Sequence, residues 1–511
     1  MRIVFFSEGI PFTGDTVFNR CLGGMESSLI YMAQALADRG HDVSVFNSCV
    51  KQYVCGKVTY YPIDFLTRWE HIQNIDVAVS CRTFAPLRVA FNPKLLVYWT
   101  GDAWNQPFVE PLKNPDIRDR FDFFALKSQW QTQTFVSHLG ICPEKCMVTR
   151  NGFYAPYYRE IPPGRNRFRL IYTSTPYRGL DVLLDMFPNI KETVPQAELH
   201  LFSSMKVYNY TDDDDKKLFG HIYDKSNQPG VYLHESIPQP ELAKELMRSA
   251  VMVYPNHFEE TSCVAAIEAQ AAGVPVVTSA LAALRETVEH GKSGFLIPSD
   301  SRLPEYKELF IEKVLALLRD EHLLDEMSRY ARERAFSLYT WEKISAEWEQ
   351  FFAEKIVYPC QRYINWFVKT GDYKKLLAIT EETIQQGHGS RDMMLLAGSL
   401  YVKLNKLDKA ELIFKELLRN EPQNVEALCR LGETRRLRGE EFEAIQCFRQ
   451  ALDIAPSYEH AWFQLAGIYE AKGYLRKALA TYRQCFDLNT EYSGFAGQKI
   501  RQITEAMQAK R

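Results

Sequence analysis

A repeat of 34 residues near the C-terminal end is the feature that most constrains the fold of this chain of 511 residues. Small residues, aromatic residues and prolines recur at this spacing between residues 391 and 492. The columns are Gly398, Gly432 and Ala466; Ala410, Ala444 and Ala478; Phe414, Phe448 and Tyr482; and Pro422, Pro456 and Thr490. Such a period predicts stacked helix pairs, in which small residues let the helices approach and proline ends the second helix. Asn405, Gly439 and Gly473 mark the turn between the two helices of each pair.

These columns resemble the tetratricopeptide (TPR) repeat family in three units, residues 391–424, 425–458 and 459–492. A degenerate unit over residues 357–390 precedes them, with Gly371 at the turn and Leu376 in the alanine column, and residues 491–511 resemble a polar capping helix. The resemblance implies an all-α solenoid whose concave face binds a peptide or protein partner. The alternative is that the repeats pack against the rest of the chain or form a homo-oligomer. A cluster of arginines in the second unit points to an acidic partner: Arg430, Arg435, Arg436 and Arg438.

The rest of the chain, up to residue 339, alternates short apolar runs with helical stretches. The expected strands are residues 1–6, 42–46, 77–80, 95–99 and 123–127, and then residues 169–172, 198–202, 251–254 and 274–278. This α/β alternation predicts two doubly wound, Rossmann-like domains with parallel sheets, residues 1–163 and 164–339, joined at Pro162-Pro163-Gly164. Ligands of such sheets bind at the carboxyl ends of the strands, so we expect a site in the cleft between the two domains.

Composition excludes several classes of protein. With 61 Lys and Arg against 64 Asp and Glu, the formal charge is −3, which argues against a nucleic-acid partner. No apolar run is long enough for a transmembrane segment. The eleven cysteines are an odd number, and we expect them to be mostly scattered, buried thiols. These features predict a cytoplasmic protein.

The segment from Tyr254 to Val277 carries most of the chemistry. A strand ends at Pro255, and a helix is expected from about Ser262 to Ala272. The amides of Thr261, Ser262 and Cys263 then lie at a helix N-terminus, which is a natural phosphate site. Glu260 is expected near the entrance of this helix and Glu268 about two turns inside it, each able to hold vicinal hydroxyls. The alternative is that Glu260 only interacts with the helix dipole and that Glu268 is a surface charge.

The context Glu-Ala-x-Ala-x-Gly-x-Pro-Val-Val, which begins at Glu268, resembles the retaining, GT-B-fold glycosyltransferases of family 4. The resemblance implies that Glu260 contacts the transferred sugar, that the amides after it hold the distal phosphate, and that Glu268 holds the ribose. Ile237 is expected near the base of the nucleotide, which backbone groups would recognise. The donor would be a UDP-, GDP- or ADP-sugar, and no metal is expected.

Other landmarks resemble the same family. Gly23 and Gly24 resemble its first glycine loop, and Asn151-Gly152 resembles the end of its first domain. Residues 291–296 resemble the last loop of its nucleotide domain. Residues 340–356 resemble the helix that crosses back onto the first domain.

The sequence departs from the family at two places. The family places two cations at the start of the second domain, and here Arg178 keeps one while Thr173 replaces the other. Arg178 is expected to hold phosphate, with a structural role in a surface turn as the alternative. The histidine that many members present from the first domain is absent. Arg82 and Asp102 follow strands there and are candidates on the acceptor side, Asp102 also for catalysis; a surface cation and a capped turn are the alternatives.

Two further features are assigned no catalytic role. The acidic run from Asp212 to Asp215 could hold a metal ion, but we expect a solvated loop. His257 lies alone in the donor loop. The sequence therefore predicts a glycosyltransferase that moves a sugar from a nucleoside diphosphate to a hydroxyl group, and the alternative is an inactive GT-B and TPR binding scaffold.

Overall fold

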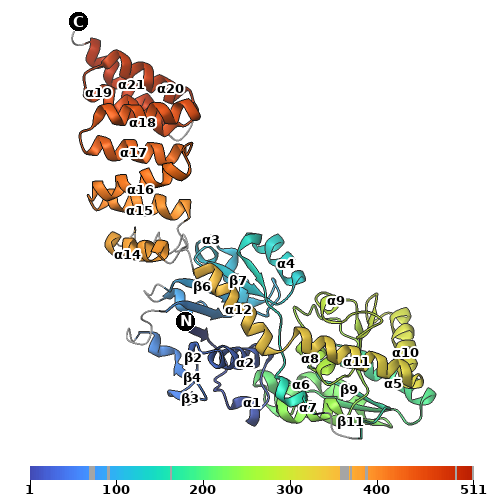
Figure 1. Ribbon diagram of the computed structural model, residues 1–511. Helices are drawn as coiled ribbons and strands as arrows, with labels where there is room; N and C mark the ends of the chain where they lie inside the picture. Colours follow the sequence, from blue (N-terminus) through green and yellow to red (C-terminus); the bar gives the residue numbers. More distant parts are fainter. Residues whose placement is uncertain are drawn as a thin grey trace. The chain divides into compact units, whose positions relative to one another are not determined.

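The computed structural model describes residues 1–67, 75–88, 93–160, 164–356, 368, 371–385, 390–488 and 492–508 (Figure 1). The chain divides into two compact units, Met1–Ile356 and Val357–Arg511. The first unit contains two α/β domains, and the second is entirely helical in its described residues.

The first domain is built on a sheet that has eight strands in the described residues, in the order β3-β4-β2-β1-β5-β6-β7-β8. The strands are β1 Arg2–Ser7, β2 Asp42–Asn47, β3 Tyr53–Cys55, β4 Val58–Pro62, β5 Val77–Cys81, β6 Leu95–Trp99, β7 Phe123–Leu126 and β8 Cys146–Val148. All neighbours pair in parallel except β3 with β4. The central strands β1, β5 and β6 are almost fully buried, as expected for strands covered on both faces.

The second domain has a parallel sheet of six strands in the described residues, in the order β11-β10-β9-β12-β13-β14. The strands are β9 Arg169–Tyr172, β10 Glu198–Phe202, β11 Val231–His234, β12 Val251–Tyr254, β13 Val276–Ser279 and β14 Gly294–Ile297. The order reverses beside β9 and β12, and the loops at their carboxyl ends are therefore the expected ligand site of this domain.

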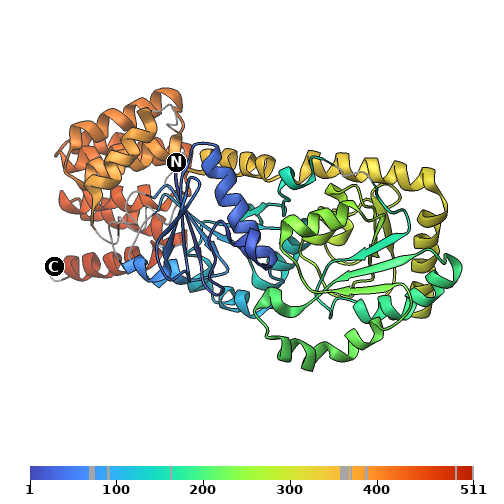
Figure 2. The same cartoon turned by 90° about the horizontal axis from the view of Figure 1, so that it is seen from below.

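Helices cover both sheets (Figures 1 and 2). They are α1 Thr16–Asn19, α2 Gly24–Asp38, α3 Pro115–Arg118, α4 Gln129–Leu139, α5 Leu180–Thr193, α6 Asp212–Tyr223, α7 Gln239–Met247, α8 Val264–Ala271, α9 Leu284–Thr287, α10 Pro304–Arg319, α11 Glu321–Leu338 and α12 Trp341–Ile356. Among the helices of the described residues, none is long and apolar enough to cross a bilayer.

The last helix of this unit, α12, returns to the first domain. Its buried side chains Trp341, Ile344, Trp348 and Phe352 belong to the apolar core formed by β1, β2, β5, β6 and α2. Trp348 stacks edge-on against Trp99, with ring centroids 5.0 Å apart, and its Nε1 donates to Thr149 Oγ1 at 2.6 Å. Figure 2 shows α12 alongside α2, with which it is in contact.

The nine expected strands all occur, within two residues of the expected ends. The strands that were not expected are β3, β4, β8, β11 and β14. They are short or lie toward the sheet edges, and β11 is half-exposed, so they lack a long apolar run. Residues 291–296 are thus not purely a loop, since β14 begins at Gly294.

The second unit consists of antiparallel helix pairs. They are α15 Arg391–Lys403 with α16 Leu407–Asn420, α17 Val425–Leu437 with α18 Glu441–Ile454, and α19 Glu459–Ala471 with α20 Leu475–Asp487, followed by α21 Ser493–Gln508. The turns contain Asn405, Gly439 and Gly473, all with left-handed φ of +56° to +80°. Of the expected degenerate unit, the structure describes α14 Tyr373–Thr383 and the turn before it, and most of its first half lies outside the described residues.

The column of small residues has a direct packing reason. A Cβ atom on Gly398 would lie 2.4 Å from the ring of Phe414, and one on Gly432 would lie 2.9 Å from the ring of Phe448. Both rings are fully buried. The aromatic side chain of each second helix therefore occupies the space that a side chain on the first helix would need.

The arginine cluster does not form a free basic surface. Arg430 pairs with Glu426 and Glu433, and Arg435 pairs with Glu411. Arg438 contacts Asp408, Glu411 and Glu440. Three of the four arginines are thus paired with carboxylates of the repeats, while Arg436 is exposed, and an acidic partner stays a prediction.

The packing of the repeats can be tested at two glycines. Gly398→Ala should destabilise the chain by about 1–3 kcal/mol, because the added methyl group overpacks against Phe414. Gly467 in α19 is the matched control, since its Cβ would come no closer than 3.9 Å to the Tyr482 hydroxyl. Gly467→Ala should raise stability by up to about 1 kcal/mol through helix propensity. Denaturant unfolding followed by circular dichroism measures both, and equal effects at the two sites would contradict this account.

Candidate functional site

A cavity of about 430 Å³ opens between the two α/β domains of the first unit. Loops at the carboxyl ends of β1, β5, β6, β9, β10, β11 and β12 line it. Every site residue expected from the sequence is in its wall: Gly23, Gly24, Arg82, Asp102, Arg178, Ile237, Glu260, Thr261, Ser262, Cys263 and Glu268. Residues far apart in the chain are thus brought to one place, while their individual roles stay predictions.

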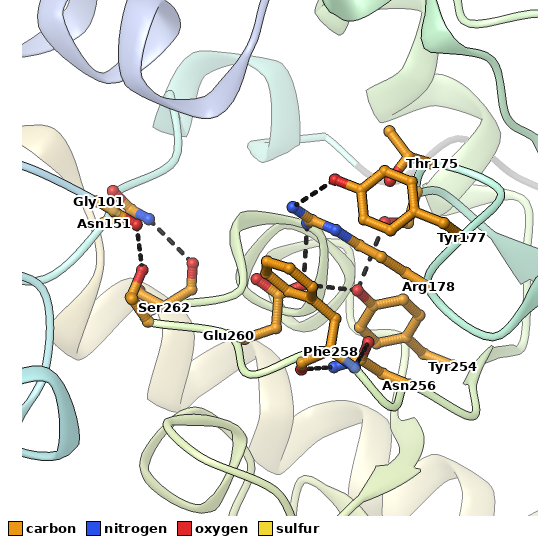
Figure 3. A network of polar contacts seen from close by, with 12 residues as sticks. Gly101, Asn151, Thr175, Tyr177, Arg178, Tyr254, Asn256, Phe258, Glu260 and Ser262 are labelled. Atoms are coloured by element: carbon orange, nitrogen blue, oxygen red, sulfur yellow. Dashed lines mark hydrogen bonds and ion pairs between the residues drawn. The ribbon is translucent and has the colours of Figure 1, made fainter. Parts of the chain in front are cut away.

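The loop after β12 leads into α8 at the cavity wall. This helix begins at Val264, with Cys263 as its N-cap, so the expected start at Ser262 was two residues early. Glu268 therefore lies about one turn inside the helix and not two. Asn151 Nδ2 donates to the Ser262 carbonyl at 3.1 Å, and Thr261 Oγ1 donates to the Gly101 carbonyl at 2.5 Å (Figure 3). These two bonds fix the loop to the first domain.

Two helix N-termini meet at this wall. Gly24 is the first residue of α2, and a Cβ atom placed on it would lie 3.6 Å from Cγ2 of Val264, the first residue of α8. The first amides of each helix have no partner within the helix and carry partial positive charge. A Cβ atom on Gly23 would come within 2.5 Å of the Glu26 carboxylate, so a side chain there would displace that carboxylate.

Glu260 and Arg178 form a buried ion pair in the cavity wall. Arg178 Nη1 donates to Glu260 Oε1 at 2.9 Å, and the Tyr254 hydroxyl donates to the same oxygen at 2.6 Å (Figure 3). The guanidinium also lies over the ring of Phe258, 4.7 Å from its centroid. Burial opposes the charge on Arg178, but the Glu260 carboxylate and the neighbouring tyrosine hydroxyls together outweigh it and keep the arginine pKa well above its usual value. Arg178 lies in a turn, residues 176–179, and its guanidinium is part of the cavity wall.

Glu268 is isolated from charge. Its side chain is buried in α8, and Gln239 Nε2 donates to its Oε1 at 3.1 Å. Burial raises the pKa of this carboxyl group to about 8. The alternative of a surface charge was wrong, because the surrounding domain leaves only 7% of the residue exposed.

Arg82 and Asp102 form an ion pair on the opposite wall of the cavity. Arg82 Nε donates to Asp102 Oδ2 at 2.8 Å, and Thr100 Oγ1 donates to the same oxygen at 2.7 Å. Arg82 has a φ of +53°, an uncommon conformation for a residue with a side chain, and its guanidinium covers the ring of Phe108 at 4.4 Å. The sequence suggested two separate candidates, but the structure joins them in an ion pair.

The missing cation leaves a polar position without a partner. The hydroxyl groups of Thr173 and Thr175 are buried and make no hydrogen bond among the described residues. Both residues line the cavity at the end of β9. They are available to a ligand that carries acceptor oxygens.

Two secondary features do not join the site. The acidic run forms the first turn of α6, capped by Thr211, so the expected loop was wrong. Asp215 is buried and accepts from Met205 N and the Tyr223 hydroxyl. No group of three potential metal ligands occurs in the part of the chain that the structure describes. His257 does not line the cavity.

Comparison with known proteins agrees with this geometry. Residues 160–334 match the model of the family "Glycosyl transferases group 1", and residues 392–424, 425–458 and 459–492 match the model of the tetratricopeptide repeat. The chain therefore has a group 1 glycosyltransferase domain and three C-terminal TPR repeats. The resemblances drawn from the sequence are confirmed at this level: residues 160–334 match a glycosyltransferase family, and residues 392–492 match TPR repeats.

Individual relatives are distant. The capsular polysaccharide biosynthesis glycosyltransferase CapM of Staphylococcus aureus is 26% identical over 43% of this chain, which spans about half (55%) of that protein. The phosphatidyl-myo-inositol mannosyltransferase of Mycobacterium leprae is 24% identical over 64% of this chain and 91% of its own.

Solved structures share the fold. Sucrose-phosphate synthase (tll1590) of Thermosynechococcus elongatus superposes with a TM-score of 0.55 at 15% identity, over 69% of this chain and 99% of the other. Alr3699/HepE of Anabaena, solved with UDP and glucose, gives a TM-score of 0.52 at 19% identity, over 69% of this chain and all of the other. The expected fold, two Rossmann-like domains of GT-B type followed by an all-α TPR region, is confirmed.

The raised pKa of Glu268 predicts a pH dependence of stability. The unfolded chain releases this proton near pH 4.5, whereas the folded chain keeps it up to about pH 8. Between these pH values the folded state binds more protons than the unfolded state. The contribution of Glu268 to stability therefore falls as pH rises from about 4.5 to about 8. Glu268→Gln should remove this slope in thermal denaturation, while Glu259→Gln, at an exposed site on the same loop, should keep it. A slope unchanged in Glu268→Gln would contradict the assignment.

Proposed function

We propose that this chain transfers a sugar from a nucleoside diphosphate sugar to a hydroxyl group of an acceptor, with retention of the anomeric configuration. The observation that carries the proposal is the placement of Glu260 and Glu268 in one cavity, on either side of the N-terminus of α8. Two carboxylates that flank an anion site match a ligand with hydroxyl groups at both ends of a diphosphate.

The donor binds along this wall. Its distal phosphate lies at the N-termini of α8 and α2, beside Arg178 and the unpaired hydroxyl of Thr173. Glu260 holds the transferred sugar and Glu268 the ribose. Ile237 lies by the base, and the donor is a UDP-, GDP- or ADP-sugar. Amides, hydroxyls and one guanidinium replace the second cation, so no metal ion is required.

The chemistry is a front-side displacement. The acceptor oxygen attacks the anomeric carbon while the bond from this carbon to the phosphate oxygen breaks. The acceptor proton passes to the departing phosphate, which carries the negative charge away. The protein contributes by stabilising this charge with Arg178 and the two helix N-termini, and by holding both reactants in place. Arg178 turns from Glu260 toward the phosphate as the donor enters, which frees Glu260 for the sugar.

The acceptor enters beside the pair of Arg82 and Asp102. Asp102 orients Arg82, and its remaining carboxylate oxygen is available to the acceptor hydroxyl. The TPR repeats recruit a protein, either the acceptor itself or a partner that presents it.

The second candidate function is an inactive binding scaffold. The absent cation at Thr173 and the absence of a histidine from the cavity lining favour it. Nucleotide binding without hydrolysis or transfer, across a panel of UDP-, GDP- and ADP-sugars, would support the scaffold and contradict the enzyme.

Substitutions at the two glutamates should separate their roles. Glu260→Gln should lower turnover by about a hundredfold, because its partner is the sugar on which charge develops in the transition state. Glu268→Ala should mainly weaken nucleotide binding, by about tenfold, because it removes a ground-state contact. Steady-state kinetics of donor hydrolysis measure both effects, and Glu308→Ala, at an exposed site on α10 away from the cavity, is the control. A raised donor KM with normal turnover in both variants would contradict the division of roles.

The role of the repeats can be tested by truncation. Deletion of residues 391–511 removes the three matched repeats and α21 and leaves the whole first unit, residues 1–356. Donor hydrolysis should persist, while transfer to the physiological acceptor in a cell extract should fall. A truncated chain that folds, binds nucleotide and modifies this acceptor at the full rate would show that the repeats serve assembly or stability.

A further inference from the structure

Gln239 is a cavity residue to which sequence reasoning gave no role. It is the first residue of α7 and follows the loop after β11. Its side chain lies between the two domains and makes one hydrogen bond to each. Nε2 donates to Glu268 Oε1 at 3.1 Å, and Oε1 accepts from the Tyr31 hydroxyl at 2.7 Å. A single amide thus connects α8 of the second domain to α2 of the first.

Tyr31 determines which way this amide points. Its hydroxyl has one proton and two neighbours, Gln239 Oε1 at 2.7 Å and the Tyr157 hydroxyl at 3.4 Å. The shorter contact is the stronger hydrogen bond, so the Tyr31 hydroxyl donates its proton to Gln239 Oε1. The carbonyl oxygen of the amide therefore faces Tyr31, and its NH₂ group faces Glu268. Among the described residues the Gln239 side chain makes no other hydrogen bond, so without the tyrosine hydroxyl only the contact with Glu268 would orient the amide.

Tyr31 is itself held at the junction of the domains. Its ring stacks on Tyr154 at 5.1 Å and lies 6.5 Å from Trp341. Tyr154 precedes the short helix Ala155–Tyr158, and Trp341 begins α12, so both rings belong to the two places where the chain crosses between domains. The position of the hydroxyl therefore depends on the relative placement of the domains.

The carboxylate has one oxygen left for a ligand. Oε1 of Glu268 receives the Gln239 hydrogen bond, and Oε2 accepts none from the described residues. A bond to one oxygen fixes the plane of the carboxylate and hence the direction in which the other oxygen points. Without this hydrogen bond, the flexible side chain of Glu268 would have no such restriction.

We propose that Tyr31 and Gln239 are positioning residues that aim Glu268 at the ribose hydroxyls and thereby make the chain select ribonucleotides over nucleotides without these hydroxyls. The inference rests on the proposed function, in which Glu268 holds the ribose. It adds that Tyr31, a residue of the first domain, orients the contact between Glu268 and the ribose. Full affinity for the ribose therefore requires both domains in place.

The test compares nucleotides with and without ribose hydroxyls. Isothermal titration measures the dissociation constants of UDP, GDP and ADP with the full chain, and then of the 2′,3′-dideoxy form of the nucleotide that binds. The variants are Tyr31→Phe, which removes only the hydroxyl, and Gln239→Leu, which removes the amide. Tyr157→Phe is the matched control, since its hydroxyl lies beside Tyr31 but makes no bond to Gln239.

The wild-type chain should bind the ribonucleotide more tightly than the dideoxy form. In Tyr31→Phe and Gln239→Leu this ratio should fall about tenfold, with the affinity for the dideoxy form unchanged. Tyr157→Phe should keep the wild-type ratio. A structural role alone would weaken both ligands equally, so an unchanged ratio in the two variants would overturn the inference while the proposed function stands. No binding of any of the three nucleotides to the wild-type chain would overturn the proposed function and this inference with it.

Discussion

The double crossing of the chain between the two α/β domains is the constraint on which the cavity depends. The first crossing passes through Gly152, and the second ends where α12 begins at Trp341. A Cβ atom on Gly152 would lie 2.6 Å from the Trp341 ring, and Phe153 N donates to the Tyr339 carbonyl at 2.9 Å, so the crossings touch each other. Because α12 is anchored in the first core by Trp348 and Phe352, the loops of both sheets are held face to face.

The described lining of the cavity has more acidic than basic side chains. Five carboxylates line it, those of Glu26, Asp102, Glu259, Glu260 and Glu268, against the two guanidinium groups of Arg82 and Arg178. Two features reduce this excess of negative charge. The raised pKa keeps Glu268 largely neutral at pH 7. The N-termini of α2 and α8 add partial positive charge without side-chain cations.

Sequence patterns identified the elements that local residues determine. The spacing of 34 residues located the three repeats, and the motif at Glu268 located the helix at the cavity and its two carboxylates. Patterns could not show contacts between distant segments. The residues that neighbour Gln239 and Tyr31 in the sequence do not indicate that these two side chains meet. Arg82, which pairs with Asp102, has a left-handed backbone conformation that no local sequence motif predicts. The ion pairs of Arg435 and Arg438 could not be seen for the same reason, since their carboxylate partners lie partly on another helix.

The ion pair of Arg178 and Glu260 places two requirements on a ligand at the same time. Glu260 is buried and Arg178 is partly buried, and separation of such a pair leaves each charge without compensation. A free sugar could satisfy Glu260 but would leave Arg178 alone, and a free phosphate would do the reverse. Under the proposed function, a molecule that presents both phosphate oxygens and sugar hydroxyls would satisfy both groups at once. Under the proposed function, the pair would therefore favour an intact donor over inorganic phosphate or a free monosaccharide.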